Sequence, residues 1–287
     1  MFVILFLSCL AALVSAGPLD SVNLETRNSP MAFDKVFWVD EGHYKCTSER
    51  KKQIITAIDE ARFLTNRAIG ALWVENAEKS EAYLTWFGKR NASPEMRRSI
   101  LKHNYQSLIT NLVHPEGSVK LDNLDDIVEK IPFPATGKSL VYACSPEDSK
   151  VGKMDTEAQT LSPIPQSTYS GPTYLVFYPA FFRRLRRSWQ LQETAEEWKH
   201  DKNAQDVGSG GFVLLHEFQH LLLATGTDRH CGDVSDPSFP PGTAGCYTAS
   251  CCRSIPDSLK VKNAQNFAFF AAYVYKWPKT AKASWGH

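Results

Sequence analysis

His216-Glu217-Phe218-Gln219-His220 is the stretch that decides the fold and the chemistry of this chain. It lies inside an apolar run from Phe212 to Leu223, which predicts a buried helix. Because His216 and His220 are four residues apart, they share one face of that helix, and both imidazoles can bind one zinc ion. Glu217 lies beside them, placed to hold a water on the metal rather than the metal itself. The spacing therefore predicts a catalytic zinc site with Glu217 as general base.

A catalytic zinc ion generally has three protein ligands, so the motif needs one more side chain. A third histidine at the spacing HExxHxxGxxH would stand at Gly226, and no glutamate follows Glu217. We favour Asp228, because it comes directly after the expected helix end at Gly226 and can fold back beneath the metal. The other candidates that the sequence leaves open are His230, Asp233, Asp236 and Asp257.

The segment after the helix adds a family resemblance. Gly226-Thr227-Asp228-Arg229-His230-Cys231-Gly232, following His-Glu-x-x-His, resembles the aspartate-zincin metalloendopeptidases, the deuterolysins and peptidyl-Lys endopeptidases secreted by fungi. Their motif runs Gly-Thr-x-Asp-x-x-Tyr-Gly, and this chain has one residue fewer before the aspartate. Cys231 stands where the family has a tyrosine that steadies the transition-state oxyanion. Tyr247 or Arg229 could supply that donor, and the sequence leaves both open.

Further landmarks extend the resemblance over residues 40–275, and they occur in the family's order. They are Trp86-Phe87-Gly88, Tyr142-Ala143-Cys144, Tyr178-Pro179-Ala180-Phe181-Phe182 and the segment 263–271, which begins Asn263-Ala264-Gln265-Asn266. The resemblance implies a single zincin-like metalloprotease domain over residues 36–287. Its expected class is α+β, mostly helical, with a small sheet and disulfide-held loops.

The amino end predicts export. Residues 1–16 form an apolar block ending in Val14-Ser15-Ala16, small residues that are typical of a signal-peptidase site. We expect residues 17–35 to be loosely ordered. No later segment has 18 unbroken apolar residues, so we expect no membrane association after the signal is removed. The predicted location is secreted and extracellular.

The cysteines agree with an oxidising compartment. Cys9 leaves with the signal peptide, and an even number remains from the seven in the chain, which predicts three disulfides. We expect Cys46 to bond Cys144. Cys231 and Cys246 are then expected to bond Cys251 and Cys252, in an order that the sequence leaves open.

Charge and periodicity give the remaining expectations. The net charge of +1, from 32 basic and 31 acidic residues, provides no electrostatic case for nucleic acid. Apolar spacing predicts helices over residues 48–74 and 258–275, and β-forming runs predict strands over 131–142 and 173–178. Residues 144–172 are polar and rich in proline and are predicted to be a loop. Gly208-Ser209-Gly210-Gly211 is predicted to be a flexible lead-in to the metal helix.

Together these patterns predict a secreted zinc-dependent metalloendopeptidase, a monomer with one zinc ion per chain that acts on protein or peptide substrates. The alternative is a catalytically inactive secreted binding protein or effector that retains the zincin fold. Two departures from the family motif motivate it, namely Cys231 at the tyrosine position and the shortened spacing before Asp228.

Overall fold

The computed structural model of the chain describes residues 29–123, 138–147, 156–161, 172–185, 209–238, 240 and 244–282. The expected signal peptide, residues 1–16, and most of the expected loose segment, residues 17–35, lie outside these ranges. No described helix is long and apolar enough to cross a lipid bilayer.

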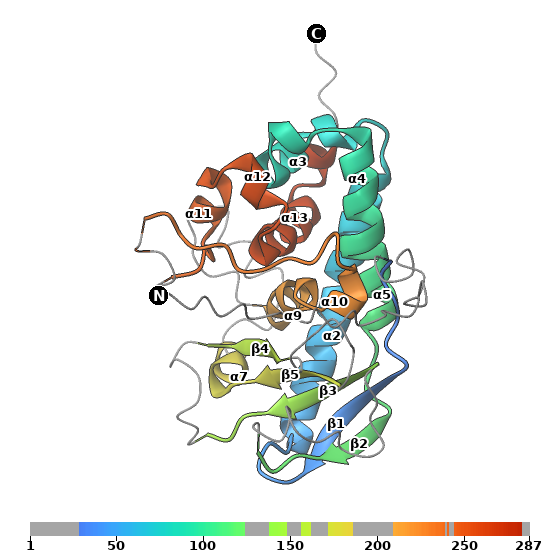
Figure 1. The fold of residues 1–287 in the computed structure, drawn as a ribbon, viewed down its shortest axis with the longest axis vertical. Helices are drawn as coiled ribbons and strands as arrows, with labels where there is room; N and C mark the ends of the chain where they lie inside the picture. The colour runs from blue at the N-terminus through green and yellow to red at the C-terminus, as the bar shows by residue number, and fades with distance from the viewer. Residues whose placement is uncertain are drawn as a thin grey trace, which may run out of the picture.

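A five-stranded sheet forms one end of the molecule, with strand order β2-β1-β3-β5-β4 (Figure 1). The strands are β1 (Lys35–Glu41), β2 (Gly117–Lys120), β3 (Ser139–Cys144), β4 (Ala158–Leu161) and β5 (Thr173–Phe177). The first three and β5 run parallel, while β4 pairs antiparallel with β5 at the edge. The central strand β3 is buried along its whole length, as expected where both faces of a parallel sheet are covered.

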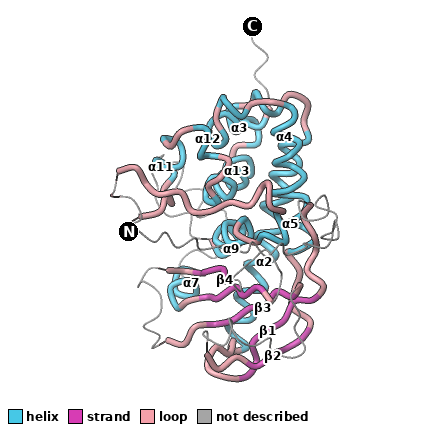
Figure 2. Tube along the Cα trace, viewed as in Figure 1, coloured by secondary structure: helices cyan, strands magenta, loops and turns pink. Residues whose placement is uncertain are grey.

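Most of the helices fill the other end of the molecule, and the long helix α2 (Ser48–Trp73) extends from them behind the sheet (Figure 2). It packs against α9 (Gly210–Gln219) and α13 (Ala264–Lys276). Its apolar stripe at Ile54, Ile58 and Ala61 is fully buried there. The remaining described helices are η1 (Ala77–Lys79), α3 (Glu81–Phe87), η2 (Lys89–Asn91), α4 (Pro94–Ile100), the π-helix η3 (Leu101–Gln106), α5 (Ser107–Asn111), α7 (Pro179–Leu185), α10 (Leu222–Thr225), α11 (Ala249–Ser254), α12 (Asp257–Lys260) and η5 (Pro278–Ala281).

Helix α9 is held directly against α2 at its first turn. The Ser209 hydroxyl accepts the N–H of Phe212 as an N-cap, and the Glu60 carboxylate accepts the N–H of Gly211 at 3.1 Å. A Cβ at position 211 would lie 2.4 Å from the Cβ of Glu60, so only glycine permits this approach. The prediction of a flexible lead-in is therefore wrong for Gly210 and Gly211, which form the start of the helix; Gly208 lies outside the described residues.

The predicted class is confirmed: the molecule is α+β, with helices predominating and one small sheet. The helix predicted over 48–74 and the strand predicted over 173–178 are present as α2 and β5. The strand predicted over 131–142 corresponds in its last part to β3, which continues to Cys144, while residues 131–137 lie outside the described ranges. Two further elements differ from the predictions. Residues 258–275 are divided into α12 and α13 by a turn, and the segment predicted to be a loop contains the edge strand β4.

Two of the three predicted disulfides are present, one of them a pairing that the sequence left open, and the third is not. Cys46 bonds Cys144 across 98 residues, joining the loop before α2 to the end of β3. Cys246 bonds Cys251, whereas Cys231 and Cys252 are free and buried. The Cys231 thiol is buried in the core, and it donates to the carbonyl of Arg229 at 3.4 Å. The expected third disulfide, which would join Cys231 to Cys252 once Cys246 has bonded Cys251, is therefore not formed, and that prediction is wrong.

Candidate metal centre

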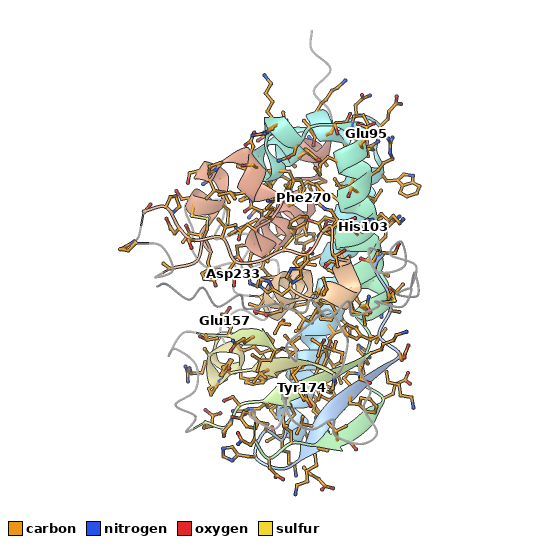
Figure 3. All side chains as sticks on the ribbon, viewed as in Figure 1. Glu95, His103, Glu157, Tyr174, Asp233 and Phe270 are labelled. Carbon is orange, nitrogen blue, oxygen red and sulfur yellow. A yellow bond between two sulfur atoms is a disulfide. The ribbon has the colours of Figure 1, made fainter. Side chains whose placement is uncertain are left out.

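Three side chains converge on one point beside α9. The Nε2 atoms of His216 and His220 are 3.1 Å apart, and Asp233 Oδ1 lies 3.3 Å from the first and 3.4 Å from the second. Within the part of the chain that the structure describes, these three residues form the cluster whose ligand atoms could together hold a metal ion. Figure 3 places Asp233 between the C-terminal helices and Glu157, the residue that directly precedes β4.

The size of this triangle fits tetrahedral zinc. Zinc binds imidazole nitrogen and carboxylate oxygen at about 2.0–2.2 Å, so two ligand atoms at a tetrahedral angle are about 3.3 Å apart. All three observed separations are close to that value. The donor set of two imidazoles and one carboxylate is also one that zinc prefers, and it leaves a fourth position for a non-protein ligand.

The two imidazoles reach this point by different means. His216 lies in the last turn of α9, whereas His220 is its C-cap and keeps helical backbone angles, so the i, i+4 relationship survives the helix end. The Nδ1 atom of His220 lies 3.0 Å from the carbonyl oxygen of Cys231. With Nδ1–H donating to that carbonyl, the Nε2 lone pair is free for a metal. Nδ1 of His216 is buried and has no hydrogen-bond partner among the described residues. The Gln265 side chain also acts on this ring, because it raises the pKa of His216 against the larger lowering effect of burial.

Asp233 is brought to the histidines by the start of α13. The N–H of Gly232 donates to the carbonyl of Lys262 at 3.0 Å, and the N–H of Ala264 donates back to Gly232 at 3.0 Å. The side-chain oxygen of Asn263 accepts the N–H of Val234 at 3.2 Å. These bonds surround Asp233 on both sides, so the backbone that carries its carboxylate is fixed.

A buried amide network ties the same loop to the back of α9. Asn104, in the π-helix η3, donates to the Gln219 side chain at 2.8 Å and accepts from the Arg229 guanidinium at 3.2 Å. The side-chain amide of Gln219 donates to the main-chain carbonyl of Asn104 at 3.0 Å. The main-chain carbonyl of Gln219 accepts the N–H of Cys231 at 3.2 Å. Because all of these groups are buried, leaving one unpaired would be costly, and the network fixes the loop path.

Glu217 lies beside the triangle. Its Oε1 is 3.9 Å from His216 Nε2, and its Oε2 accepts a hydrogen bond from the Thr160 hydroxyl at 2.9 Å. Burial raises the pKa of the carboxyl, while the His220 charge and the Thr160 hydrogen bond act in the opposite direction. A buried carboxylate of raised pKa next to a metal position is typical of a general base.

His220 and Asp233 carry opposite charges when no metal is bound, whereas His216 is neutral. Burial and the charge of the neighbouring His220 together lower the pKa of His216 to about 4, so this ring is neutral. Burial alone would lower the pKa of His220, but its hydrogen bond to Asp233 and the charge of Glu217 raise it to about 9. Burial likewise opposes ionisation of Asp233, yet the bonds and charges of the two histidines lower its pKa to about 2. The metal-free site therefore holds a protonated His220 against an ionised Asp233.

Tyr247 also contacts the site, through Asp233 and His216. Its hydroxyl donates to Asp233 Oδ2 at 3.0 Å, and its ring packs edge-on against His216 with centroids 5.8 Å apart. Burial and the Asp233 charge raise the pKa of the phenol, so it stays protonated and can donate. The structure thus brings Tyr247, one of the two predicted oxyanion donors, to the metal position.

Three other predicted residues lie elsewhere. Asp228, favoured as third ligand from the sequence, is exposed, and its charge acts on His103 and Arg229 rather than on the histidine pair. His230 Nε2 contacts the carbonyl of His220 at 2.9 Å and faces the backbone. The Arg229 guanidinium is buried in the Asn104 network. The structure therefore brings Asp233, one of the alternatives that the sequence left open, to the histidine pair, whereas Asp228 lies away from it. The bonds at Gly232 direct residue 233 toward the two rings.

Two residues that contact the site were not predicted, Thr160 and Gln265. Thr160 lies in a segment predicted to be a loop, and nothing in its neighbourhood signals a strand. Gln265 was quoted within a family landmark but was given no role. It is the second residue of α13, two residues after the bridge at Asn263, and its amide donates to the Tyr247 carbonyl at 2.9 Å.

The charge state of the metal-free site gives a prediction for metal binding. Since the pKa of His220 is about 9, at pH 7 the site holds one proton that zinc must displace. Zinc affinity should rise by up to about tenfold per pH unit between pH 7 and 9 and level off above that. Chelator-competition titrations at pH 7, 8 and 9, with proton release measured in weak buffer, check this. An affinity that does not change with pH, with no proton released, would contradict the assigned ion pair.

Comparisons with known proteins add little to this geometry. No family model matches the sequence, and no curated protein matches it. Among solved structures, the chain is similar to a zinc peptidase from Grifola frondosa, at 16% sequence identity and a TM-score of 0.44. The alignment covers 79% of this chain and 96% of that one. At this identity and TM-score, the likeness carries no argument about function, which depends on the site itself.

Proposed function

We propose that this chain is a zinc-dependent metalloendopeptidase with His216, His220 and Asp233 as metal ligands and Glu217 as general base. One observation carries the proposal. The ligand atoms form a triangle of 3.1, 3.3 and 3.4 Å, the size of a tetrahedral zinc face, and a buried carboxylate lies on the same helix beside it. Two of the three ligands and the base were predicted from the sequence, and the third was among its alternatives.

Each residue of the site has a role in peptide hydrolysis. When bound, zinc supplies Lewis acidity that polarises a carbonyl and lowers the pKa of a water molecule. Glu217 Oε1 faces the metal side and takes the proton of the attacking water. Tyr247, protonated and partly exposed to solvent, donates to Asp233 when no substrate is bound, and in this proposal it donates to the developing oxyanion during the reaction.

The edge strand β4 supports an extended peptide as the substrate. Tyr178 N–H donates to the Glu157 carbonyl at 2.9 Å, which makes these two residues a hydrogen-bonded pair. Because such pairs alternate along an antiparallel ladder, the main-chain groups of Ala158 and Thr160 point away from β5. No described strand pairs with that side. A peptide that paired there would lie beside α9 and the metal position.

The two sequence departures that favoured the alternative, an inactive binding protein, carry less weight once the site geometry is known. It rested on Cys231 at the tyrosine position and on the spacing before Asp228. Asp233 takes the ligand place and Tyr247 supplies a phenol beside it, so neither departure leaves the site incomplete. The Cys46–Cys144 and Cys246–Cys251 bonds support the further proposal that the protein acts outside the cell.

A cleavage assay with metal control tests the proposed function. Purified protein should contain one zinc ion per chain and cleave fluorescent casein. Treatment with a strong zinc chelator should abolish cleavage, and added zinc should restore it. Stoichiometric zinc without cleavage of casein or of a diverse peptide library would reject the peptidase and return the binding protein as the better account.

A further inference from the structure

We infer that Thr160 is a positioning residue for Glu217, which fixes Oε2 in a hydrogen bond and leaves Oε1 as the oxygen that accepts the proton. The inference rests on the proposed function for its catalytic meaning. Its structural content, the orientation of one carboxylate by one hydroxyl, is independent of any activity.

The contact is short, buried and specific. The Thr160 hydroxyl lies 2.9 Å from Glu217 Oε2 and 3.3 Å from the Glu217 main-chain oxygen. A hydroxyl has one proton, and the shorter contact to a charged acceptor is the stronger one. Among the described residues, Thr160 is the one side chain that donates to this carboxylate. Because Glu217 is 6% exposed, water has little access to replace that bond.

The hydrogen bond makes the two carboxylate oxygens different. With Oε2 held by Thr160, Oε1 is directed toward the ligand triangle, 3.9 Å from His216 Nε2. This separation is too long for a direct hydrogen bond to the histidine. It leaves Oε1 without a side-chain donor and facing the position where a water must be deprotonated. Without the hydroxyl, the carboxylate could rotate and present either oxygen, or neither, at the required angle.

Thr160 also connects the base to the edge of the sheet. Its side chain points toward α9, while its main-chain groups point toward the open side of β4. A β-branched side chain has a restricted χ1, so the strand determines where the hydroxyl lies. The residue whose backbone would pair with a bound peptide is therefore the residue that orients the general base.

Two substitutions separate the hydroxyl from the shape of the side chain. Thr160→Val keeps the branched shape and removes the donor, whereas Thr160→Ser keeps the donor. We expect Thr160→Val to lower kcat by about 10- to 100-fold, because catalytic groups that lose their alignment cost rates of that order. KM and zinc content should stay close to wild type. Thr160→Ser should restore most of kcat, a rescue that a purely structural role would not produce.

Thr56→Val is a matched control, because it removes a hydroxyl that donates to the Lys52 carbonyl on the exposed side of α2. It should leave kcat unchanged. A kcat for Thr160→Val equal to that of wild type, with full zinc content, would overturn the inference. So would an equal loss of kcat in the valine and serine variants.

Crystal structures of the metal-free wild-type, serine and valine proteins provide a readout that needs no activity. Glu217 Oε2 should stay within hydrogen-bond distance of residue 160 in wild type and Thr160→Ser, and the carboxylate should turn away in Thr160→Val. An unmoved carboxylate in Thr160→Val would overturn the inference. If wild type and all variants failed to cleave any peptide, the proposed function would fail, while these structures would still decide the role of Thr160.

Discussion

Glu217→Gln should lower kcat for peptide cleavage by about 10²- to 10⁴-fold, the range that a positioned general base contributes. Glutamine keeps the shape of the side chain and can still pair with the Thr160 hydroxyl through its carbonyl oxygen, but it cannot take a proton from water. Since Glu217 is not one of the three ligands, zinc content should remain at one ion per chain. Steady-state kinetics at matched zinc occupancy give the measurement.

Glu60→Gln is the matched control for that substitution. Glu60 is also a partly buried carboxylate of raised pKa, because burial outweighs its hydrogen bond from Gly211 N–H. A glutamine there keeps an oxygen acceptor for the start of α9, so kcat should be unchanged. A Glu217→Gln protein with wild-type kcat would show that another group accepts the proton, and the assigned mechanism would be wrong.

Asp233→Ala should weaken zinc binding by more than about 100-fold. Partners that only orient a metal ligand are worth about 10- to 100-fold in affinity, and a ligand itself is worth more. The substitution removes a carboxylate oxygen that lies near both Nε2 atoms, and it also removes the acceptor of the Tyr247 hydroxyl. Competition against a chelator of known affinity measures the loss.

Asp228→Ala is the discriminating control, because this aspartate is five residues away and exposed. Its zinc affinity should match that of wild type. If Asp228→Ala lost as much affinity as Asp233→Ala, the original sequence preference would be right and the loop path described above would be wrong.

The local part of the site was readable in the sequence. His216, Glu217 and His220 lie within five residues on one helix, so their geometry follows from helical spacing alone. The long helix α2 was equally readable, because its apolar residues repeat over many turns. The Cys46–Cys144 bond was predicted correctly as well.

The third ligand could not be settled in that way. Asp228 and Asp233 are both within reach of the helix end, and the choice depends on bonds between Gly232 and the segment Lys262–Ala264, about 30 residues along the chain. The same is true of Tyr247, which reaches Asp233 across a separation of 14 residues. Neither contact has a local sequence signal.

Strand β4 shows why Thr160 was missed. Its four residues, Ala158–Leu161, read Ala-Gln-Thr-Leu and lack the run of β-branched and aromatic side chains that identified β5. The strand forms because β5 offers it an edge, and its pairing with β5 brings Thr160 to Glu217. Tertiary context, not propensity, therefore determines this part of the site.

The position of the bound metal tests the account most directly. Anomalous diffraction at the zinc edge, from crystals of the zinc-loaded protein, should show one ion about 2.0–2.2 Å from Nε2 of His216, Nε2 of His220 and a carboxylate oxygen of Asp233. The Glu217 carboxylate should lie nearby without binding it. An ion held by Asp228 in place of Asp233, or no ion at the histidine pair in protein that cleaves peptides, would contradict the account.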